Sequence, residues 1–208
     1  MIGTAIRIAA GYLATPLRER SRSLREWIDR IRSKRRLQRL VRQQRFPKQV
    51  KSVLVVCKGN ICRSPLAEAY LKQGFAQCGQ NVAVCSAGLE TSLGKPAHNF
   101  AQLVGRSAGI PLDDHVTKPL LKEHVEHADL IVAMEHAHYH RLQKLYPTCR
   151  GKIFLLRQFG DRYGTHNTAV EIADPYSGTL CEFQECFSII RRSCDHLISD
   201  VCRTNANI

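Results

Sequence analysis

Four short apolar runs recur along the chain, and segments with helical periodicity separate them. Each run has the length and composition of a buried strand, and the runs lie at residues 52–56, 82–86, 129–134 and 152–156. The predicted helices lie near residues 65–78, 96–108, 118–125, 136–145 and 180–203. Strands that alternate with helices indicate a parallel sheet covered on both faces. We therefore expect one three-layer α/β domain with a four-stranded parallel sheet.

The first fifty residues follow a different pattern. Between residues 17 and 45, apolar side chains recur at helical intervals with arginines between them, which predicts a basic amphipathic helix. Pro47 interrupts this pattern. We therefore divide the chain into an N-terminal arm at residues 1–50, partly helical or disordered, and a domain at residues 51–208.

Charge separates the same two regions. The whole chain carries +13 at pH 7, and residues 1–50 hold 14 of its Lys and Arg but only 3 of its Asp and Glu, a net +11. A basic amphipathic helix is typical of segments that bind an anionic membrane surface. A solvated arm, or a helix packed on the domain, explains the pattern equally well, and we expect nucleic acid not to be the partner.

Residues 2–17 are mildly apolar, but Arg7 and Gly11 interrupt them. The segment is too short to span a membrane, and it lacks the order of a signal peptide. An Arg-rich, acid-poor arm leaves a transit peptide open as an alternative.

The strongest chemical signal follows the first predicted strand, where residues 56–65 read V-C-K-G-N-I-C-R-S-P. A strand that turns directly into a helix leaves the first N–H groups of the helix free to bind a dianion. Gly59 and Asn60 suit the left-handed backbone of such a loop. Arg63 adds a permanently charged fork that binds two phosphate oxygens, while Ser64 either donates to a thiolate or caps the helix. This segment predicts a phosphate-binding loop.

Cys57 lies at the base of this loop. Facing a helix N-terminus and an arginine, it should be a thiolate near neutral pH, placed for in-line attack on phosphorus. A single cysteine at a strand end is commonly a core residue, but here the neighbouring residues all fall where one reaction needs them. A nucleotide-binding P-loop is disfavoured because its G-x-x-x-x-G-K-[ST] spacing is absent.

The run C-x-G-N-x-C-R-S-P resembles the signature of the low molecular weight protein tyrosine phosphatases, and the similarity extends over roughly residues 51–205. The resemblance implies the phosphotyrosine phosphatase I-like fold and no cofactor. It also implies that Cys57 forms a cysteinyl-phosphate and that Arg63 binds the phosphoryl group in the transition state. The other residues of the loop would bind the substrate phosphate, namely Lys58, Gly59, Asn60, Ile61, Cys62 and Ser64.

A second signal lies far along the chain, in Asp174-Pro175-Tyr176. From spacing alone, an Asp-Pro turn is the better explanation. The resemblance instead implies that Asp174 is the general acid for the tyrosyl oxygen and then the base that activates water. Tyr176 would form an aromatic wall of the pocket. Vertebrate members often carry a second aromatic residue where this chain has Ser177, so we expect that wall to differ.

Two further matches support the resemblance, Ser86 in the segment S-A-G and His115 after G-I-P-L. By analogy, Asn60, Ser64, Ser86 and His115 would form the network that holds the loop open. For His115, an ordinary surface histidine is an equally good explanation on the sequence alone.

Relatives that share this loop include arginine phosphatases and arsenate reductases. The arginine phosphatases tend to carry Thr at the place of Ile61, so the apolar residue here favours tyrosine. Arsenate reduction by this fold uses two further cysteines in the middle of the chain, and none lies between Cys85 and Cys149. We expect a protein tyrosine phosphatase, a phosphoric monoester hydrolase acting on a tyrosine-phosphorylated protein such as a tyrosine kinase. The alternatives are a phosphoarginine phosphatase, an arsenate reductase, or a membrane or nucleic-acid docking protein.

The chain has nine cysteines, but Cys57 has to be reduced to react. We therefore expect a cytoplasmic protein, peripheral at the membrane if the arm binds lipid. Cys62 either forms a reversible disulfide with Cys57 that prevents over-oxidation or is a small packing residue. His136 and His140 would share a helix face, but no other ligand is spaced to complete a site, so we expect no metal.

Overall fold

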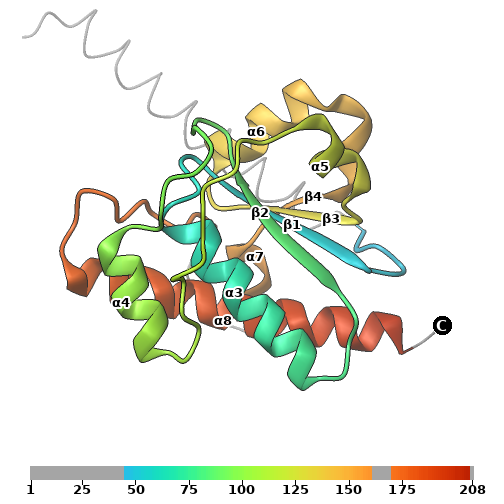
Figure 1. Ribbon diagram of the computed structural model, residues 1–208. Coiled ribbons are helices and arrows are strands. Elements are labelled where there is room, and N and C mark those ends of the chain that lie inside the picture. Colours follow the sequence, from blue (N-terminus) through green and yellow to red (C-terminus); the bar gives the residue numbers. More distant parts are fainter. Residues whose placement is uncertain (1–44, 161–169, 207–208) are drawn as a thin grey trace, which may run out of the picture. The chain divides into compact units, whose positions relative to one another are not determined.

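The computed structural model describes residues 45–160 and 170–206, which form the domain (Figure 1). The basic helix predicted at residues 17–45 lies outside the described residues except for Arg45. None of the described helices combines the length and the apolar content needed to cross a membrane.

The centre of the domain is a four-stranded sheet in which every neighbouring pair of strands is parallel, in the order β2-β1-β3-β4. The strands are β1 (Ser52–Cys57), β2 (Ala83–Gly88), β3 (Leu130–Ala133) and β4 (Ile153–Leu155). This confirms the predicted sheet, with strand ends that differ from the predicted ones by one or two residues.

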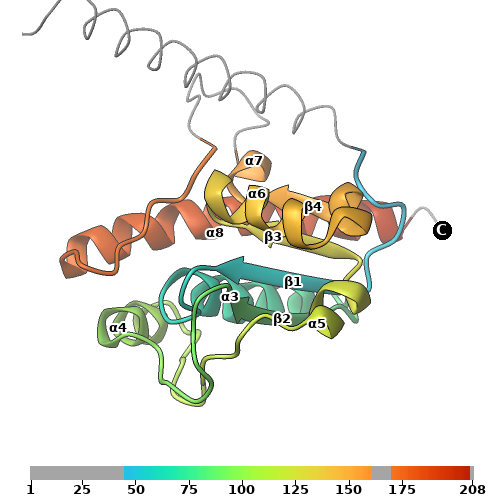
Figure 2. The same ribbon diagram turned by 90° about the horizontal axis from the view of Figure 1, so that it is seen from above.

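Helices cover both faces of the sheet (Figure 2). Those that follow the predicted segments are α3 (Arg63–Gln77), α4 (Asn99–Ser107), α5 (Lys122–His127), α6 (His136–Leu145) and α8 (Leu180–Asn205). Helices α5 and α6 lie on one face, whereas α3 and α8 pack together on the other. The three-layer α/β fold is therefore confirmed.

Some predicted boundaries are wrong, and two short elements were not predicted. Helix α5 begins at Lys122 rather than near residue 118 because the preceding segment pairs with the end of β2. Gly88 donates its N–H to the carbonyl of Lys118 over 2.8 Å, and Leu120 donates to the carbonyl of Gly88 over 2.8 Å. The unpredicted elements are a 3-10 helix, η1 (Pro147–Lys152), and one turn of helix, α7 (Arg157–Gly160).

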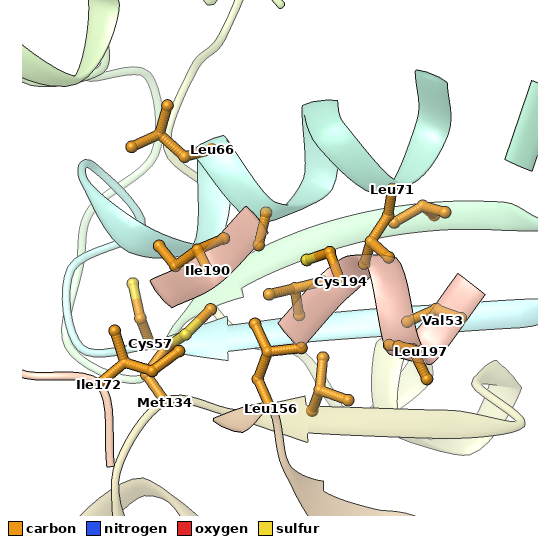
Figure 3. Close-up of a cluster of buried hydrophobic side chains, with 14 of the residues drawn as sticks. Val53, Cys57, Leu66, Leu71, Met134, Leu156, Ile172, Ile190, Cys194 and Leu197 are labelled. Atoms are coloured by element: carbon orange, nitrogen blue, oxygen red, sulfur yellow. The ribbon is translucent and has the colours of Figure 1, made fainter. Parts of the chain in front are cut away.

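The core lies between the sheet and the helices α3 and α8 (Figure 3). All of β1 from Val53 to Cys57 is buried, as expected for a central parallel strand. The chain before β1 joins this core, because the ring of Phe46 meets the edges of Phe154 and Phe159 at centroid distances of 6.0 and 5.9 Å.

The strand order determines where a ligand can bind. The chain places β2 on one side of β1 and β3 on the other. The connections that leave β1 and β3 therefore diverge, and in open α/β sheets the resulting crevice at the carboxyl ends is the usual ligand site. The loop after Cys57 and the start of α6 after β3 both open into this crevice.

Candidate active site

The loop between β1 and α3 runs from Lys58 to Cys62. Its left-handed residue is Asn60, with φ of 55°, whereas Gly59 does not take a positive φ. Within the described chain, no side chain caps the N-terminus of α3 and no acidic residue lies in its first turn. The free N–H groups at that end therefore form a site for an anion.

The side chain of Asn60 holds the loop in this conformation. Its amide nitrogen donates to the hydroxyls of Ser64 over 2.9 Å and Ser86 over 2.8 Å. Its amide oxygen accepts from the N–H of Lys118 over 2.9 Å. Asn60 is fully buried, so these bonds offset both the loss of solvation and the cost of the left-handed backbone.

Two hydrogen bonds meet at the sulfur of Cys57. The N–H of Asn60 donates to it over 3.2 Å, and the Ser64 hydroxyl lies 3.0 Å away. Ser64 already accepts from Asn60, so its own hydrogen is free to point at the sulfur. Ser64 therefore contacts the nucleophile and does not cap the helix.

Behind the loop, the same hydrogen-bond network ends at a buried carboxylate. The hydroxyl of Ser86 donates to Glu68 over 2.5 Å, and Lys72 contacts the other oxygen of Glu68 at 2.6 Å. The sequence interpretation did not include Glu68. A glutamate on the buried face of the helix after the loop is the signal that could have identified it.

His115 completes the network. Its Nε2 lies 2.8 Å from the carbonyl oxygen of Asn60, which can only accept, so the proton is on Nε2. Burial lowers the pKa of His115, which favours the neutral ring at neutral pH. His115 therefore contacts the loop through the backbone of Asn60.

Arg63 is almost entirely buried, with 1% of its surface exposed. Its Nη1 pairs with Glu135 and donates to the carbonyl of Ile172 over 2.9 Å, and its Nη2 lies 2.6 Å from Asp174. Burial opposes the charge, but the hydrogen bond that Arg63 donates to Glu135 and the neighbouring negative groups outweigh it and raise the pKa of Arg63. Among the described residues, the buried Nε of Arg63 has no acceptor.

The sequence interpretation also missed Glu135. It is the N-cap residue of α6 and follows β3 closely. An acidic residue directly after a buried parallel strand is the available signal, because such residues meet at the carboxyl edge of the sheet.

Asp174 reaches the loop because the segment before it is tied to the end of β3. The N–H of Ile172 donates to the carbonyl of Met134 over 2.9 Å. Figure 3 shows Ile172 and Met134 beside Cys57. Because of this hydrogen bond, Asp174 lies beside Arg63 although the two residues are far apart in the sequence. The side chain of Asp174 remains 36% exposed.

A pocket of about 190 Å³ opens above the loop. The predicted site residues that line it are Cys57, Lys58, Gly59, Ile61, Cys62, Arg63, Asp174 and Tyr176, and Glu90 joins them. Asn60, Ser64, Ser86 and His115 lie behind the loop in the network. The structure therefore brings together every residue of the predicted site.

An aromatic cluster supports the outer wall of the pocket. Tyr176 is 58% exposed, and its ring meets that of His98 edge to face at 5.8 Å. The ring of His98 stacks on Phe183 at 4.7 Å, and the backbone N–H of His98 donates to the carbonyl of Ile61 over 2.8 Å. His98 therefore links the loop to Tyr176, a role that no sequence pattern indicated.

The opposite rim carries charges that the sequence interpretation did not assign. Glu90 lines the pocket, forms an ion pair with Arg141 of α6 and lies 3.9 Å from Lys58. These side chains are largely exposed, so their mutual attraction is weak and they are free to contact a substrate.

Two other thiols, those of Cys62 and Cys186, lie near the site. Burial is the main cause that raises the pKa of Cys62, and it raises that of Cys186 to about 12. Both therefore remain protonated at neutral pH. Whether Cys62 pairs with Cys57 on oxidation stays a prediction.

Among the described residues, no three His, Cys, Asp or Glu side chains are grouped to hold a metal ion. His136 instead pairs with Glu171 at 3.2 Å. His138 is buried, and its burial lowers its pKa.

Comparison with known sequences identifies relatives over the same region. The model of the family described as low molecular weight phosphotyrosine protein phosphatase matches residues 52–207. A probable low molecular weight protein-tyrosine-phosphatase, EpsP of Ralstonia nicotianae, is 36% identical over 146 residues, which is 70% of this chain and 92% of the relative. The low molecular weight protein-tyrosine-phosphatase Ptp of Acinetobacter johnsonii is 36% identical over 143 residues, which is 69% of this chain and 92% of the relative.

Comparison with solved structures identifies relatives of the same kind. The tyrosine phosphatase AmsI of Erwinia amylovora has a TM-score of 0.65 and 32% identity, covering 73% of this chain and 93% of its own. The YwlE arginine phosphatase of Geobacillus stearothermophilus has a TM-score of 0.67 and 30% identity, and the match covers 76% of this chain and 96% of that protein. The match over residues 52–207 and these relatives show that the chain belongs to the low molecular weight protein tyrosine phosphatase family.

Proposed function

We propose that this protein hydrolyses phosphotyrosine in proteins through a phosphorylated Cys57. The observation that carries the proposal is the placement of this thiol below a pocket that Arg63 and Asp174 also line. Nucleophile, phosphate-binding cation and acid are thereby within reach of one phosphoryl group, which is the arrangement that phosphoryl transfer to sulfur requires.

Binding of the phosphate would change the partners of Arg63. In the free site, Nη2 pairs with Asp174 while Nε is unpaired. A phosphoryl dianion on the loop offers two oxygens to this side of the guanidinium, while Glu135 continues to hold Nη1. Asp174 would then leave Arg63 and face the leaving oxygen, where its carboxyl group can carry the proton that the tyrosyl oxygen needs.

The reaction proceeds in two displacements at phosphorus. The thiolate of Cys57 attacks, the bond from phosphorus to the tyrosyl oxygen breaks, and Asp174 gives that oxygen its proton. In the second step Asp174 takes a proton from water, the water oxygen bonds to phosphorus, and the thiolate leaves. Arg63 and the N–H groups of the loop stabilise the charge on the equatorial oxygens in both steps.

Loss of the nucleophile tests the mechanism directly. Cys57→Ser should reduce turnover of p-nitrophenyl phosphate below detection but retain binding of inorganic phosphate, measured by calorimetry. Cys181→Ser is the matched control, because this thiol is exposed on α8, and it should keep full turnover. Hydrolysis by Cys57→Ser at the rate of the unmodified enzyme would exclude the cysteinyl-phosphate.

The walls of the pocket support tyrosine as the substrate residue. Ile61 and Tyr176 give it apolar and aromatic surface, which suits a phenyl ring. Phosphoarginine is the second candidate, since the YwlE arginine phosphatase is among the structural relatives. We expect kcat/KM to be highest for a phosphotyrosine peptide and much lower for phosphoserine and phosphoarginine peptides of the same sequence. Ile61→Thr should narrow the gap to phosphoarginine, and a phosphoarginine peptide that is the best substrate would reject the tyrosine assignment.

The arm would give the enzyme its location. We infer a cytoplasmic enzyme whose basic residues 17–45 bind an anionic membrane surface, where a tyrosine kinase is a suitable substrate. The net charge of +11 on residues 1–50 supports this inference. The full chain should co-sediment with vesicles that contain phosphatidylserine, and a chain without residues 1–46 should not. Equal sedimentation of the two chains would refute membrane binding through the arm.

A further inference from the structure

A second pair of thiols lies where α3 and α8 end, away from the catalytic loop. Cys78 is the C-cap residue of α3 and is exposed, whereas Cys202 lies in the last turn of α8 and is partly buried. Burial raises the pKa of Cys202, and so does a hydrogen bond that its thiol forms with the thiol of Cys78. The packing of α3 against α8 brings the ends of the two helices, and with them the two thiols, close together.

The helices themselves hold the two thiols together. Figure 1 shows α3 and α8 side by side and running in the same direction. One turn before Cys78, a Cβ on Gly74 would lie 2.3 Å from the side chain of Ile198, one turn before Cys202. This glycine therefore lets the helices approach closely just before the thiol pair.

The ends of both helices are also anchored to each other. Asn205, in the last turn of α8, donates to the side chain of Gln80 over 3.2 Å and to the carbonyl of Val50 over 3.0 Å. The N–H of Val50 donates back to Asn205 over 3.0 Å. The residues that follow each thiol are thus tied to one another and to the chain before β1, which holds the two helix ends together.

We propose that Cys78 and Cys202 form an oxidation-sensitive dithiol that low-molecular-weight disulfides convert to a disulfide between α3 and α8. The exposed Cys78 thiolate attacks a disulfide such as oxidised glutathione and releases one glutathione thiol. Cys202 then loses its proton and attacks the sulfur of Cys78, which releases the second glutathione. Two protein thiols are oxidised and one glutathione disulfide is reduced, so the electrons balance.

This modification would act on the fold and not on the chemistry. Cys78 and the loop lie at opposite ends of α3, which has 15 residues, or about 22 Å of helix. The disulfide would close a long stretch of chain, from the end of α3 to the end of α8, and such cross-links stabilise by restricting the unfolded state. The inference does not depend on the proposed substrate, because it involves no residue of the pocket.

The first experiment maps the bond. The purified full chain is treated with oxidised glutathione, alkylated, digested with trypsin and analysed by mass spectrometry. Cys202 shares a tryptic peptide, residues 193–203, with Cys194, so fragment ions have to assign the linked sulfur. We expect a link from Cys78 to Cys202. The proposal fails if Cys78 is recovered as an alkylated free thiol, as a mixed disulfide with glutathione, or linked to a cysteine other than Cys202.

The second experiment measures stability. Oxidation should raise Tm by about 5–10 °C, and a reductant should reverse the shift. Cys78→Ser should abolish the shift while keeping the reduced-state Tm, because Cys78 is exposed. Cys202→Ser should also abolish it, and Cys181→Ser, which removes another exposed thiol of α8, should leave it unchanged. An unchanged shift in Cys78→Ser would overturn the proposal.

Discussion

Arg63 and Asp174 form the pair on which the proposed chemistry depends. They are far apart in the sequence, yet their side chains are 2.6 Å apart in the free site. In the proposed mechanism, a phosphate ligand would compete with Asp174 for the same guanidinium, so binding of the substrate would release Asp174 to face the leaving oxygen.

Replacing the acid should affect substrates unequally. Asp174→Ala should lower kcat/KM for phenyl phosphate, whose leaving group needs a proton, by about 10²–10⁴-fold. It should lower kcat/KM for dinitrophenyl phosphate much less, since that phenolate leaves without a proton. Steady-state kinetics with a series of aryl phosphates measures the difference. The control is Asp195→Ala, which removes an exposed carboxylate of α8, and equal losses for all substrates would remove Asp174 as the acid.

At the scale of elements, the end of β2 supports the catalytic loop from behind. Ser86 bonds to Asn60, and Gly88 lies under the loop. A Cβ on Gly88 would be 2.7 Å from Cγ2 of Thr91, 3.0 Å from the carbonyl oxygen of Lys58 and 3.1 Å from the Cβ of Asn60. A side chain at the end of this strand would therefore press against the loop.

A methyl group at Gly88 should disturb the loop more than it disturbs the fold. Gly88→Ala should lower kcat/KM by roughly 10²-fold, because small displacements of reacting groups have effects of this size. It should cost about 1–3 kcal/mol of stability through overpacking. Gly151→Ala adds the same group where no atom lies within 4 Å, so its activity and Tm should be unchanged. Full activity of Gly88→Ala would show that the loop tolerates the displacement.

At the scale of the whole molecule, the half-buried His115 and the buried His138 should make stability depend on pH. Burial lowers the pKa of His115 and of His138 below the usual value of 6.5. Asn60, Glu68, Lys72 and Lys118 act on His115. The folded state thus binds fewer protons than the unfolded state below that value, so stability falls as pH falls.

The free energy of unfolding should therefore decrease from neutral pH to about pH 5, the range in which histidine titrates. Each histidine can contribute at most about 1.4 kcal/mol per pH unit. Urea denaturation at several pH values measures the slope of the free energy of unfolding against pH. His115→Gln should reduce this slope. His140→Gln, at an exposed position of α6, is the control and should leave the slope unchanged. Stability that is constant or rises on acidification would contradict this account.

The sequence by itself determined the layers and the reactive residues. Apolar runs that alternate with helical periodicity specify a parallel sheet, and the residues from Cys57 to Arg63 are adjacent in the chain, so their spacing alone indicates a phosphate loop. It also identified Asp174 and Tyr176, but only through the resemblance.

The tertiary structure decided which distant residues complete the site. Glu68, Glu135 and His98 act through hydrogen bonds and ring contacts between separate elements, and no local pattern specifies such contacts. The placement of Cys78 and Cys202 at the neighbouring ends of α3 and α8 has the same origin. Local periodicity reports which face of an element is buried, whereas the crossing of two helices or two loops depends on the packing of the whole core.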